Sequence, residues 1–586
     1  MHHDEHEHEH ASAGHDKGAP SGMVGFDSHT QATAGGYFTS GRFIGSMLAI
    51  GFSIASGAGT FSLPAAILSS IDADIGPDKN IVWVSYMGVL GLAVGLPLVA
   101  RLSDIFGRRW YYLGGNFFML VGAIVCATAK SVPTLVGGTV ILSVASGAAF
   151  SFSFLINEIV PMKYRFIGTA SGYLFALPTS GFGAAVAISL AAKSPGGWRW
   201  VYYLMMILDG IALFFFYFFY HPPTFKMKQG ERSKLQMLKD LDFVGMFLFS
   251  VGIVIFLLGL SWGGVTEPWK SAGVIAPIVL GVATLAAFVA WEIYWPLKQP
   301  MVPKHLFNDR DWVVAALLLA FAASIYYALA IVWPQAVVAL YAEGHGTHAL
   351  LSAASTIPYL GGQITGGLLC KQIGRLKWQC FTIALVGGTL LACLATTGPH
   401  DMPTALGLLI SGVFCMGWME SITQTLVGIC VRNQKEIGTA VGMAGSVRSV
   451  ISTIASTIYI IVLDNRLKKT LPGAVVPAVE RAGLPASSIP ALMAALATNS
   501  ESAYDAVKGL TPQILSVAQN AYKEGSSRAY STVFLVTLAV SGLSVVLSLI
   551  APNVDHLMTN HVAVMLQHQK KDEGPKKEGE LSELQA

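Results

Sequence analysis

Stretches of about 20 uncharged, mostly apolar residues recur along this 586-residue chain and limit what it can fold into. They lie near residues 43–66, 81–100, 110–129, 132–156, 166–192, 200–220, 243–263, 271–291, 312–338, 349–369, 378–398, 403–427, 437–463 and 530–551. Lipid offers no partner for backbone N–H and C=O groups, so each stretch is expected to form a helix. The sequence therefore predicts an all-α polytopic membrane protein with fourteen transmembrane helices.

The composition argues against a water-soluble fold. Only 12% of the residues are charged, 53% are hydrophobic, and the mean hydropathy is +0.56. A soluble domain carries roughly 25% charged residues, so this chain has too few charges to cover a surface of its size. We expect the lipid bilayer to surround most of it.

The distribution of Lys and Arg predicts the orientation. With the N-terminus inside, the short inner loops hold most of these residues, including Arg108, Arg109, Lys163, Arg165 and Arg375. The short outer loops hold only Lys79, Lys130, Lys193, Arg199 and Lys270. This is the positive-inside pattern, and it predicts that both termini are cytoplasmic. We expect the plasma membrane, with a vacuolar or vesicle membrane as the alternative, and the net charge of +3 gives no reason to expect nucleic acid.

Two sequence echoes indicate an internal duplication. Residues 167–172 read IGTASG and residues 437–442 read IGTAVG, while DIFGRRW (104–110) resembles KQIGRLKW (371–378) at nearly the same offset. Each pair falls at the same place if the first six and last six spans are equivalent halves. The pattern predicts two six-helix pseudo-repeats with two inserted helices between them, an architecture of many secondary transporters.

The expected domain boundaries follow from these spans. They are a His/Glu-rich cytoplasmic tail at 1–40, a six-helix half at 41–221, a linker with two inserted helices at 222–296, a second half at 297–551 with a long outer loop at 464–529, and a tail at 552–586. Both tails are expected to be disordered. The outer loop suggests short amphipathic helices separated by Pro and Gly breaks, either capping the outward opening or acting as a spacer.

Several motifs carry a family resemblance over roughly residues 40–555. They include RLSDIFGRRW (101–110), GWRWVYYL (197–204), LDFVG (241–245) and LSWGG (260–264). The chain resembles the major facilitator superfamily in its fourteen-span drug/proton antiporter branch. With RFIGSMLAIGF (42–52) and IDADIGPDKNIVWVS (71–85), it is most similar to fungal trichothecene efflux pumps and related siderophore transporters. Leu177-Pro178-Thr-Ser-Gly181-Phe-Gly183 departs from the Gly-Pro signature of the branch.

The resemblance implies a secondary active transporter. The implied function is proton-driven efflux of a fungal secondary metabolite, toxin or drug by alternating access, with a small amphipathic organic substrate and protons as partners. Siderophore-iron uptake and a non-transporting membrane sensor are the alternatives. The sequence contains no G-x-x-x-x-G-K-[ST] loop and no enzyme constellation, so we expect no enzymatic activity and no cofactor. We expect a monomer.

Three ionisable residues inside predicted spans are candidates for proton coupling, because such groups are costly in a membrane. They are Asp209, Glu420 and Arg448. Glu420 and Arg448 each lie 12 residues from the basic loop 432–436, and a rise of about 1.5 Å per residue places them at similar depth. They are expected to form an ion pair, either functional or a static packing element. Asp209 is a proton site or a partner for a polar group on a neighbouring helix.

The echoed loop residues are candidates for a cytoplasmic gating motif. They are Asp104, Gly107, Arg108, Arg109, Gly374 and Arg375. Glycine permits a tight turn, and the charges are able to pair across helices as the halves move. The alternative is topology signalling alone.

Aromatic and polar residues in the spans are candidates for the substrate cavity. They are Tyr173, Tyr326, Tyr327, Trp333, Gln335, Gln363, Trp418, Gln424 and Ser452. A bulky amphipathic ligand suits such a lining, although any one of them is more often a packing residue. The N-terminal MHHDEHEHEH has no nearby Cys and no ligand spacing, so no metal site is expected there.

Overall fold

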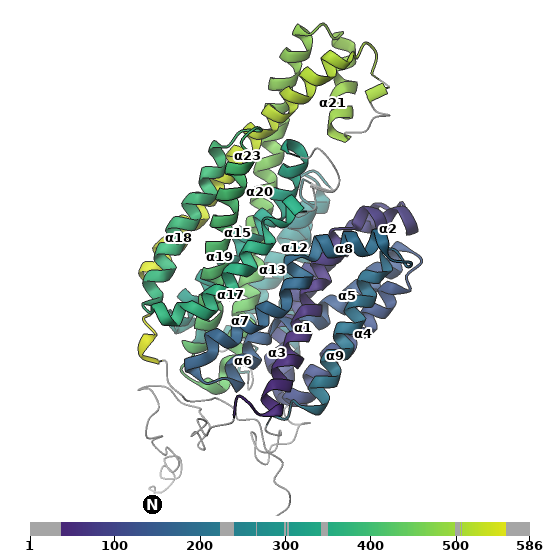
Figure 1. Cartoon of the computed structure of the whole chain (residues 1–586). Coiled ribbons are helices and arrows are strands. Elements are labelled where there is room, and N and C mark those ends of the chain that lie inside the picture. The colour runs from purple at the N-terminus through teal and green to yellow at the C-terminus, as the bar shows by residue number, and fades with distance from the viewer. Residues whose placement is uncertain are drawn as a thin grey trace, which may run out of the picture.

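The computed structural model describes residues 37–222, 239–264, 267–297, 300–301, 304–341, 350–498, 504–505 and 507–557. These residues are almost entirely helical (Figure 1). Eleven helices are long and apolar enough to cross a membrane, and a bent pair of helices makes a twelfth span. The all-α polytopic class is confirmed. The tail residues 1–36 and 558–586, including the His-rich segment, lie outside the described part.

The first half contains six helical units. They are α1 (Gly41–Ala65), α3 (Trp83–Phe106), α4 (Arg108–Ala127), α5 with α6 (Val132–Phe150 and Phe152–Ile159), α7 with α8 (Arg165–Ala176 and Gly183–Lys193), and α9 (Arg199–Phe218). A short helix, α2 (Leu68–Ile75), follows α1. Helix α1 contacts α5, α7 and α9, and α4 contacts α5 and α9.

The second half repeats this arrangement. Its units are α15 (Arg310–Leu340), α17 (Thr356–Ile373), α18 (Leu376–Cys393), α19 (Met402–Ile429), α20 (Ile437–Arg481) and α23 (Pro512–Leu549), with the short α14 (Lys304–Asn308) before them. Helix α15 contacts α19, α20 and α23, and α18 contacts α19 and α23, so helices at equivalent positions make equivalent contacts. The halves meet through α3 against α20 and through α7 against α17.

Two further helices lie between the halves in sequence. Helices α12 (Phe243–Trp262) and α13 (Ala272–Tyr294) pack on each other, and α12 also contacts α3 and α20. Asp242 caps α12 through the Gly245 N–H at 2.8 Å and accepts a hydrogen bond from Trp291 Nε1 at 2.9 Å. Most of α13 is exposed apolar surface, as expected for a peripheral pair that faces lipid.

The count of fourteen spans stays a prediction. Each predicted stretch contains a helical unit, but α3 and α17 fall outside the eleven helices and the bent pair that are long and apolar enough to span. Glycines and polar residues such as Gln363 lower the apolar character of α17. Both helices lie where the two halves meet, so protein covers much of their surface in place of lipid.

The fifth predicted stretch, 166–192, is not one straight helix. A π-helical turn at Leu177–Gly181 separates α7 from α8, and the two parts are bent by 45°. Pro178 explains the break, because proline lacks the backbone N–H and its ring clashes with the preceding turn. Thr179 stabilises the bend by donating a hydrogen bond to the Ala55 carbonyl oxygen at 2.6 Å.

The expectation of short broken helices in 464–529 is wrong for much of this segment. Helix α20 runs unbroken to Arg481 with Pro472 and Pro477 inside it, and α23 begins at Pro512. Together with α21 (Ile489–Thr498) they form a projection beyond the membrane-spanning bundle (Figure 1). Val475, Val479, Leu492 and Ala518 are fully buried in its own apolar core. This packing offsets the cost of proline inside a helix.

The echoed glycines make equivalent turns between the second and third helices of each half. Gly107 precedes α4 with φ +90°, and Gly374 follows α17 with φ +70°. Side chains disfavour this left-handed region, so glycine suits both positions. We name the end of the bundle that carries these turns the basic end, because Arg108, Arg109 and Arg375 lie there; the loop charges predict that it is cytoplasmic.

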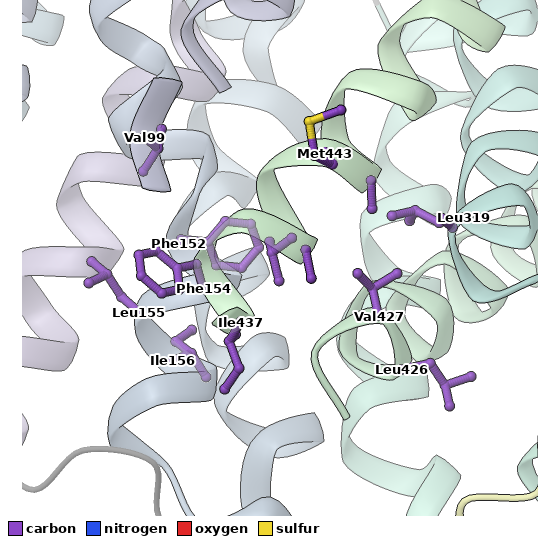
Figure 2. Close-up of a cluster of buried hydrophobic side chains, with 14 of the residues drawn as sticks. Val99, Phe152, Phe154, Leu155, Ile156, Leu319, Leu426, Val427, Ile437 and Met443 are labelled. Atoms are coloured by element: carbon purple, nitrogen blue, oxygen red, sulfur yellow. The ribbon is translucent and has the colours of Figure 1, made fainter. Parts of the chain in front are cut away.

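A buried apolar cluster joins the two halves near the basic end. Ile437 and Met443 of α20 lie close to Phe152 and Phe154 of α6, with Val427 of α19 beside them (Figure 2). A Cβ on Gly438 would stand 2.8 Å from the Phe154 ring, so the glycine of the second echo permits this close packing. The halves are therefore sealed together at this end.

Gly417→Ala is expected to destabilise the second half strongly. A Cβ at this position of α19 would overlap the carbonyl oxygen of Tyr359 on α17, and backbone cannot rotate away. Overpacking costs about 1–3 kcal/mol or more. Gly407→Ala is the matched control, because the same helix has open space there. Thermal unfolding in detergent should show a lower Tm for Gly417→Ala only; equal Tm values would contradict the close approach.

Candidate functional site

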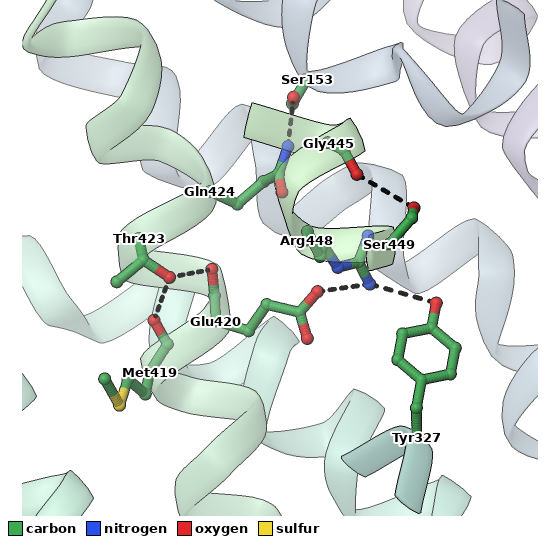
Figure 3. A network of polar contacts seen from close by, with 9 residues as sticks. All are labelled: Ser153, Tyr327, Met419, Glu420, Thr423, Gln424, Gly445, Arg448 and Ser449. Atoms are coloured by element: carbon green, nitrogen blue, oxygen red, sulfur yellow. Dashed lines mark hydrogen bonds and ion pairs between the residues drawn. The ribbon is translucent and has the colours of Figure 1, made fainter. Parts of the chain in front are cut away.

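Glu420 of α19 and Arg448 of α20 form an ion pair between Glu420 Oε1 and Arg448 Nη2 at 2.6 Å. The Glu420 side chain is 0% exposed and that of Arg448 is 17% exposed. Figure 3 shows Arg448 between Glu420 and Tyr327. Glu420 Oε2 has no hydrogen-bond partner in the described part of the chain. A buried carboxylate with a free oxygen can accept a proton or a polar ligand group.

Three tyrosines surround this pair. Arg448 Nη2 donates to the Tyr327 hydroxyl oxygen at 3.3 Å, and its guanidinium lies 5.5 Å from that ring's centroid. Tyr326 stacks on Tyr359, with 3.7 Å between ring centroids. Tyr173 of α7 interacts electrostatically with both charges. The ion pair of the second half is thus in contact with the first half through α7.

On the side of the pair toward the basic end, polar contacts cross between the halves. Gln424 Nε2 donates to Ser153 Oγ at 2.7 Å, and Thr425 Oγ1 donates to Thr169 Oγ1 at 3.2 Å (Figure 3 shows the first). Both bonds would break if the halves separated here. Ser452 Oγ and Gln363 Oε1 are buried without a hydrogen-bond partner among the described residues, so both keep an unused polar atom.

The other predicted cavity residues do not join the cluster around the ion pair. Trp333 is buried in the core of the second half, and its Nε1 donates to the Leu351 carbonyl oxygen at 2.8 Å. Trp418 Nε1 donates to Gln379 Oε1 at 3.3 Å, which directs it toward α18. Gln335 lies exposed on α15. Sequence spacing alone did not separate these packing positions from the central face.

Asp209 lies apart from the ion pair, inside the first half. It is 0% exposed on the face of α9 that packs against α1 and α4, and neither carboxylate oxygen has a hydrogen-bond partner among the described residues. Ser56 of α1 is the polar side chain that acts on it. This placement agrees with the structural alternative, a polar contact with a neighbouring helix, and its role in proton coupling stays a prediction.

The predicted gating motif makes its described contacts within the first half. Arg108 pairs with Glu158 at 3.1 Å and donates to Ser103 Oγ at 2.7 Å. Arg109 donates to the Tyr217 carbonyl oxygen. The Asp104 side chain lies outside the described part. In the second half, the Arg375 backbone N–H donates to Asp555 Oδ2 at 3.1 Å.

The sequence reasoning missed two residues at the basic end. Arg165 is 0% exposed at the start of α7 and donates to Gln434 Oε1 at 3.0 Å and to the Gly428 carbonyl oxygen at 3.4 Å, both in the other half. Glu158 neutralises Arg108. The available signals were an arginine two residues before the first echo and an acid at the end of a span, which loop-charge counting treated as topology only.

Two repeated six-helix halves around a buried ion pair at their interface define a secondary transporter of the major facilitator type. A crystallised proton:xylose symporter of that superfamily, XylE, has the same fold, with a TM-score of 0.52 at 14% identity over 89% of this chain and 99% of the symporter. The chain belongs to the fungal trichothecene efflux pump (TRI12) family, whose model matches residues 25–585.

Curated relatives match nearly the whole chain. The trichothecene efflux pump TRI12 of Fusarium sporotrichioides is 29% identical, covering 91% of this chain and 90% of the relative. The protein of that name from Trichoderma arundinaceum is 27% identical, covering 90% and 89%. The MFS-type transporter prx5 of Penicillium rubens is 28% identical, covering 86% and 89%. The family resemblance seen in the motifs is confirmed.

Proposed function

We propose that this protein exports a small amphipathic organic molecule, of the secondary-metabolite or toxin class, by alternating access driven by the proton gradient. The observation that carries the proposal is the Glu420–Arg448 ion pair, buried at the meeting of the two halves. The tyrosines Tyr173, Tyr326 and Tyr327 add aromatic surface beside it. Aromatic rings and a few polar groups suit an apolar ligand with hydroxyl or carbonyl groups.

Proton coupling follows from the chemistry of the pair. When Glu420 takes up a proton it loses its attraction to Arg448, and the arginine is then free to bind a polar group of the substrate. When the substrate leaves, Arg448 again favours the ionised form of Glu420 and the proton is released. Proton and substrate thus compete for one site, which is the requirement for antiport.

The names of the relatives favour export over siderophore uptake. The two trichothecene efflux pumps cover about nine-tenths of their own length with this chain. The sensor alternative differs in predicting no net flux. The proposed location is the plasma membrane with both termini cytoplasmic, supported by the excess of Arg and Lys at the basic end. The proposed oligomeric state is a monomer.

Deleting the gene is expected to raise the intracellular level of one small organic metabolite and to lower its level in the medium. Small molecules are compared in cells and medium, with the gene intact and deleted, at high and low iron. A protonophore added to the intact strain should reproduce the deletion, because it removes the gradient. A ferric chelate left in the medium at low iron would instead indicate uptake, and unchanged levels of all small molecules would favour the sensor.

A further inference from the structure

An apolar groove runs between α1 and α7 near the basic end. It has a volume of about 520 Å³, and its walls include Phe43, Ile44 and Met47 on one side with Ile167 and Phe175 on the other. Ile44 is 47% exposed and Ile167 is 42% exposed. In a membrane, surfaces of this kind face acyl chains.

The groove offers almost nothing to a polar ligand. Ser171 lines it, but its hydroxyl donates to the Gly168 carbonyl oxygen of its own helix at 2.6 Å. The face of α7 that forms the groove is also distinct from the face that meets the ion pair. Ile167, Ser171 and Phe175 recur every four residues on one side, while Thr169 and Tyr173 turn toward the second half.

Two lysines stand where the groove ends, at Tyr164. The Lys163 ammonium lies 5.6 Å from the Tyr164 ring centroid, and that of Lys371 lies 5.4 Å from it. Neither lysine forms an ion pair with any residue that the structure describes. Each ammonium instead repels the other. An anion placed between them would relieve this repulsion.

We propose that this groove binds one anionic phospholipid of the membrane leaflet at the basic end. One acyl chain lies between α1 and α7, and the phosphate group lies at Lys163 and Lys371. The length of the apolar groove and the two unneutralised charges at its end match the two parts of such a lipid. A free phosphate would use the lysines only, and a neutral lipid the groove only.

The lipid would bridge the two halves. Lys163 precedes α7 in the first half, whereas Lys371 belongs to α17 in the second and donates to the Lys163 carbonyl oxygen at 3.0 Å. Separation of the halves at the basic end would pull the two lysines apart. The bound lipid therefore favours the state closed at this end, a consequence that rests on the alternating access proposed above.

Native mass spectrometry of the purified protein in neutral detergent tests the site without measuring transport. Phosphatidylserine is expected to form one tight adduct and to exceed phosphatidylcholine with the same chains by roughly fivefold for each lysine. The Lys163→Gln/Lys371→Gln double variant should reduce phosphatidylserine binding to the phosphatidylcholine level. Ile44→Trp should fill the groove and weaken both adducts, and millimolar inorganic phosphate should not displace the lipid.

Two matched variants serve as controls. Lys239→Gln removes an exposed lysine that precedes α12, and Val279→Trp adds a ring to the exposed face of α13, 59% exposed; both should bind lipid as the unmodified protein does. If the lysine variant unfolds, the rise in Tm of the unmodified protein with phosphatidylserine over phosphatidylcholine decides the question. Equal binding of the two lipids, or a double variant that keeps the preference, would overturn the site.

Discussion

Glu420→Gln is expected to abolish proton-driven transport while leaving the exchange of substrate across the membrane intact. Glutamine has nearly the shape of glutamate and can still accept a hydrogen bond from Arg448 Nη2, which lies 2.6 Å from Glu420 Oε1. It cannot take up or release a proton near neutral pH. The step in which a proton displaces Arg448 from the carboxylate is therefore lost, and substrate movement no longer depends on the gradient.

The measurement uses protein reconstituted into liposomes. Uphill transport driven by an imposed pH difference should fall to the background of empty liposomes. Counterflow, in which labelled substrate exchanges with unlabelled substrate and no net proton moves, should persist. This split separates a proton site from a packing element, because a damaged fold would reduce both activities together.

Changes at Arg448 give the control. Arg448→Met leaves Glu420 buried without its partner, and removing one member of a buried pair costs about 3–5 kcal/mol, so the Tm should fall. Adding Glu420→Gln to Arg448→Met should restore stability without restoring proton-driven transport. If the double variant regained full transport, the pair would be a static element, and the proposed coupling would be wrong.

The sequence predicted the arrangement of helices well, because lipid imposes it. Apolar length and the need to satisfy backbone groups limit each span to a helix, and the two echoes located the repeat. The projection built by α20 and α23 was outside this reasoning. Pro472 and Pro477 act as breaks by local rules, yet α20 continues through both. Packing between segments far apart in sequence decided that outcome.

The candidate site was predictable only where depth in the membrane determined contact. Glu420 and Arg448 are equally far from one short loop, so helix rise alone placed them together. Trp333 and Trp418 had the right composition but the wrong helix face. Arg165 was read as a loop charge, although it is fully buried and bonded to the other half. Which face a residue presents depends on helix rotation, which the weak periodicity of buried helices does not fix.

Arg165→Met is expected to open the basic end of the transporter. Arg165 donates to Gln434 Oε1 and to the Gly428 carbonyl oxygen, both across the interface between the halves. Hydrogen bonds to charged groups contribute about 1.5–3 kcal/mol each. Methionine keeps much of the side-chain volume but makes neither bond, so the closed state loses stability relative to the open one. We expect the open population to rise roughly tenfold or more, within the range of measured coupling energies.

The chain contains its own probe for this change. Cys430 is buried beside Gly428 at the end of α19, and Cys126 is buried between α4 and α5 in the first half. Alkylation by a membrane-impermeant maleimide, followed residue by residue by mass spectrometry, should become roughly tenfold faster at Cys430, in proportion to the open population. The rate at Cys126 should not change, because the fold of the first half protects it. A parallel rise at Cys126 would mean unfolding, not opening.

Arg199→Met is the matched variant for this experiment. Arg199 pairs with Asp74 at 2.8 Å, and the hydrogen bonds from Trp198 and Arg199 hold the pKa of Asp74 below its usual value. Both residues belong to the first half, far along the chain from the Arg165 contacts, so their loss does not separate the halves. Cys430 should react at the unmodified rate in Arg199→Met. If Arg165→Met also left Cys430 protected, the bonds from Arg165 would not hold the basic end closed, and the seal would rest on the apolar packing of Phe154 against Gly438.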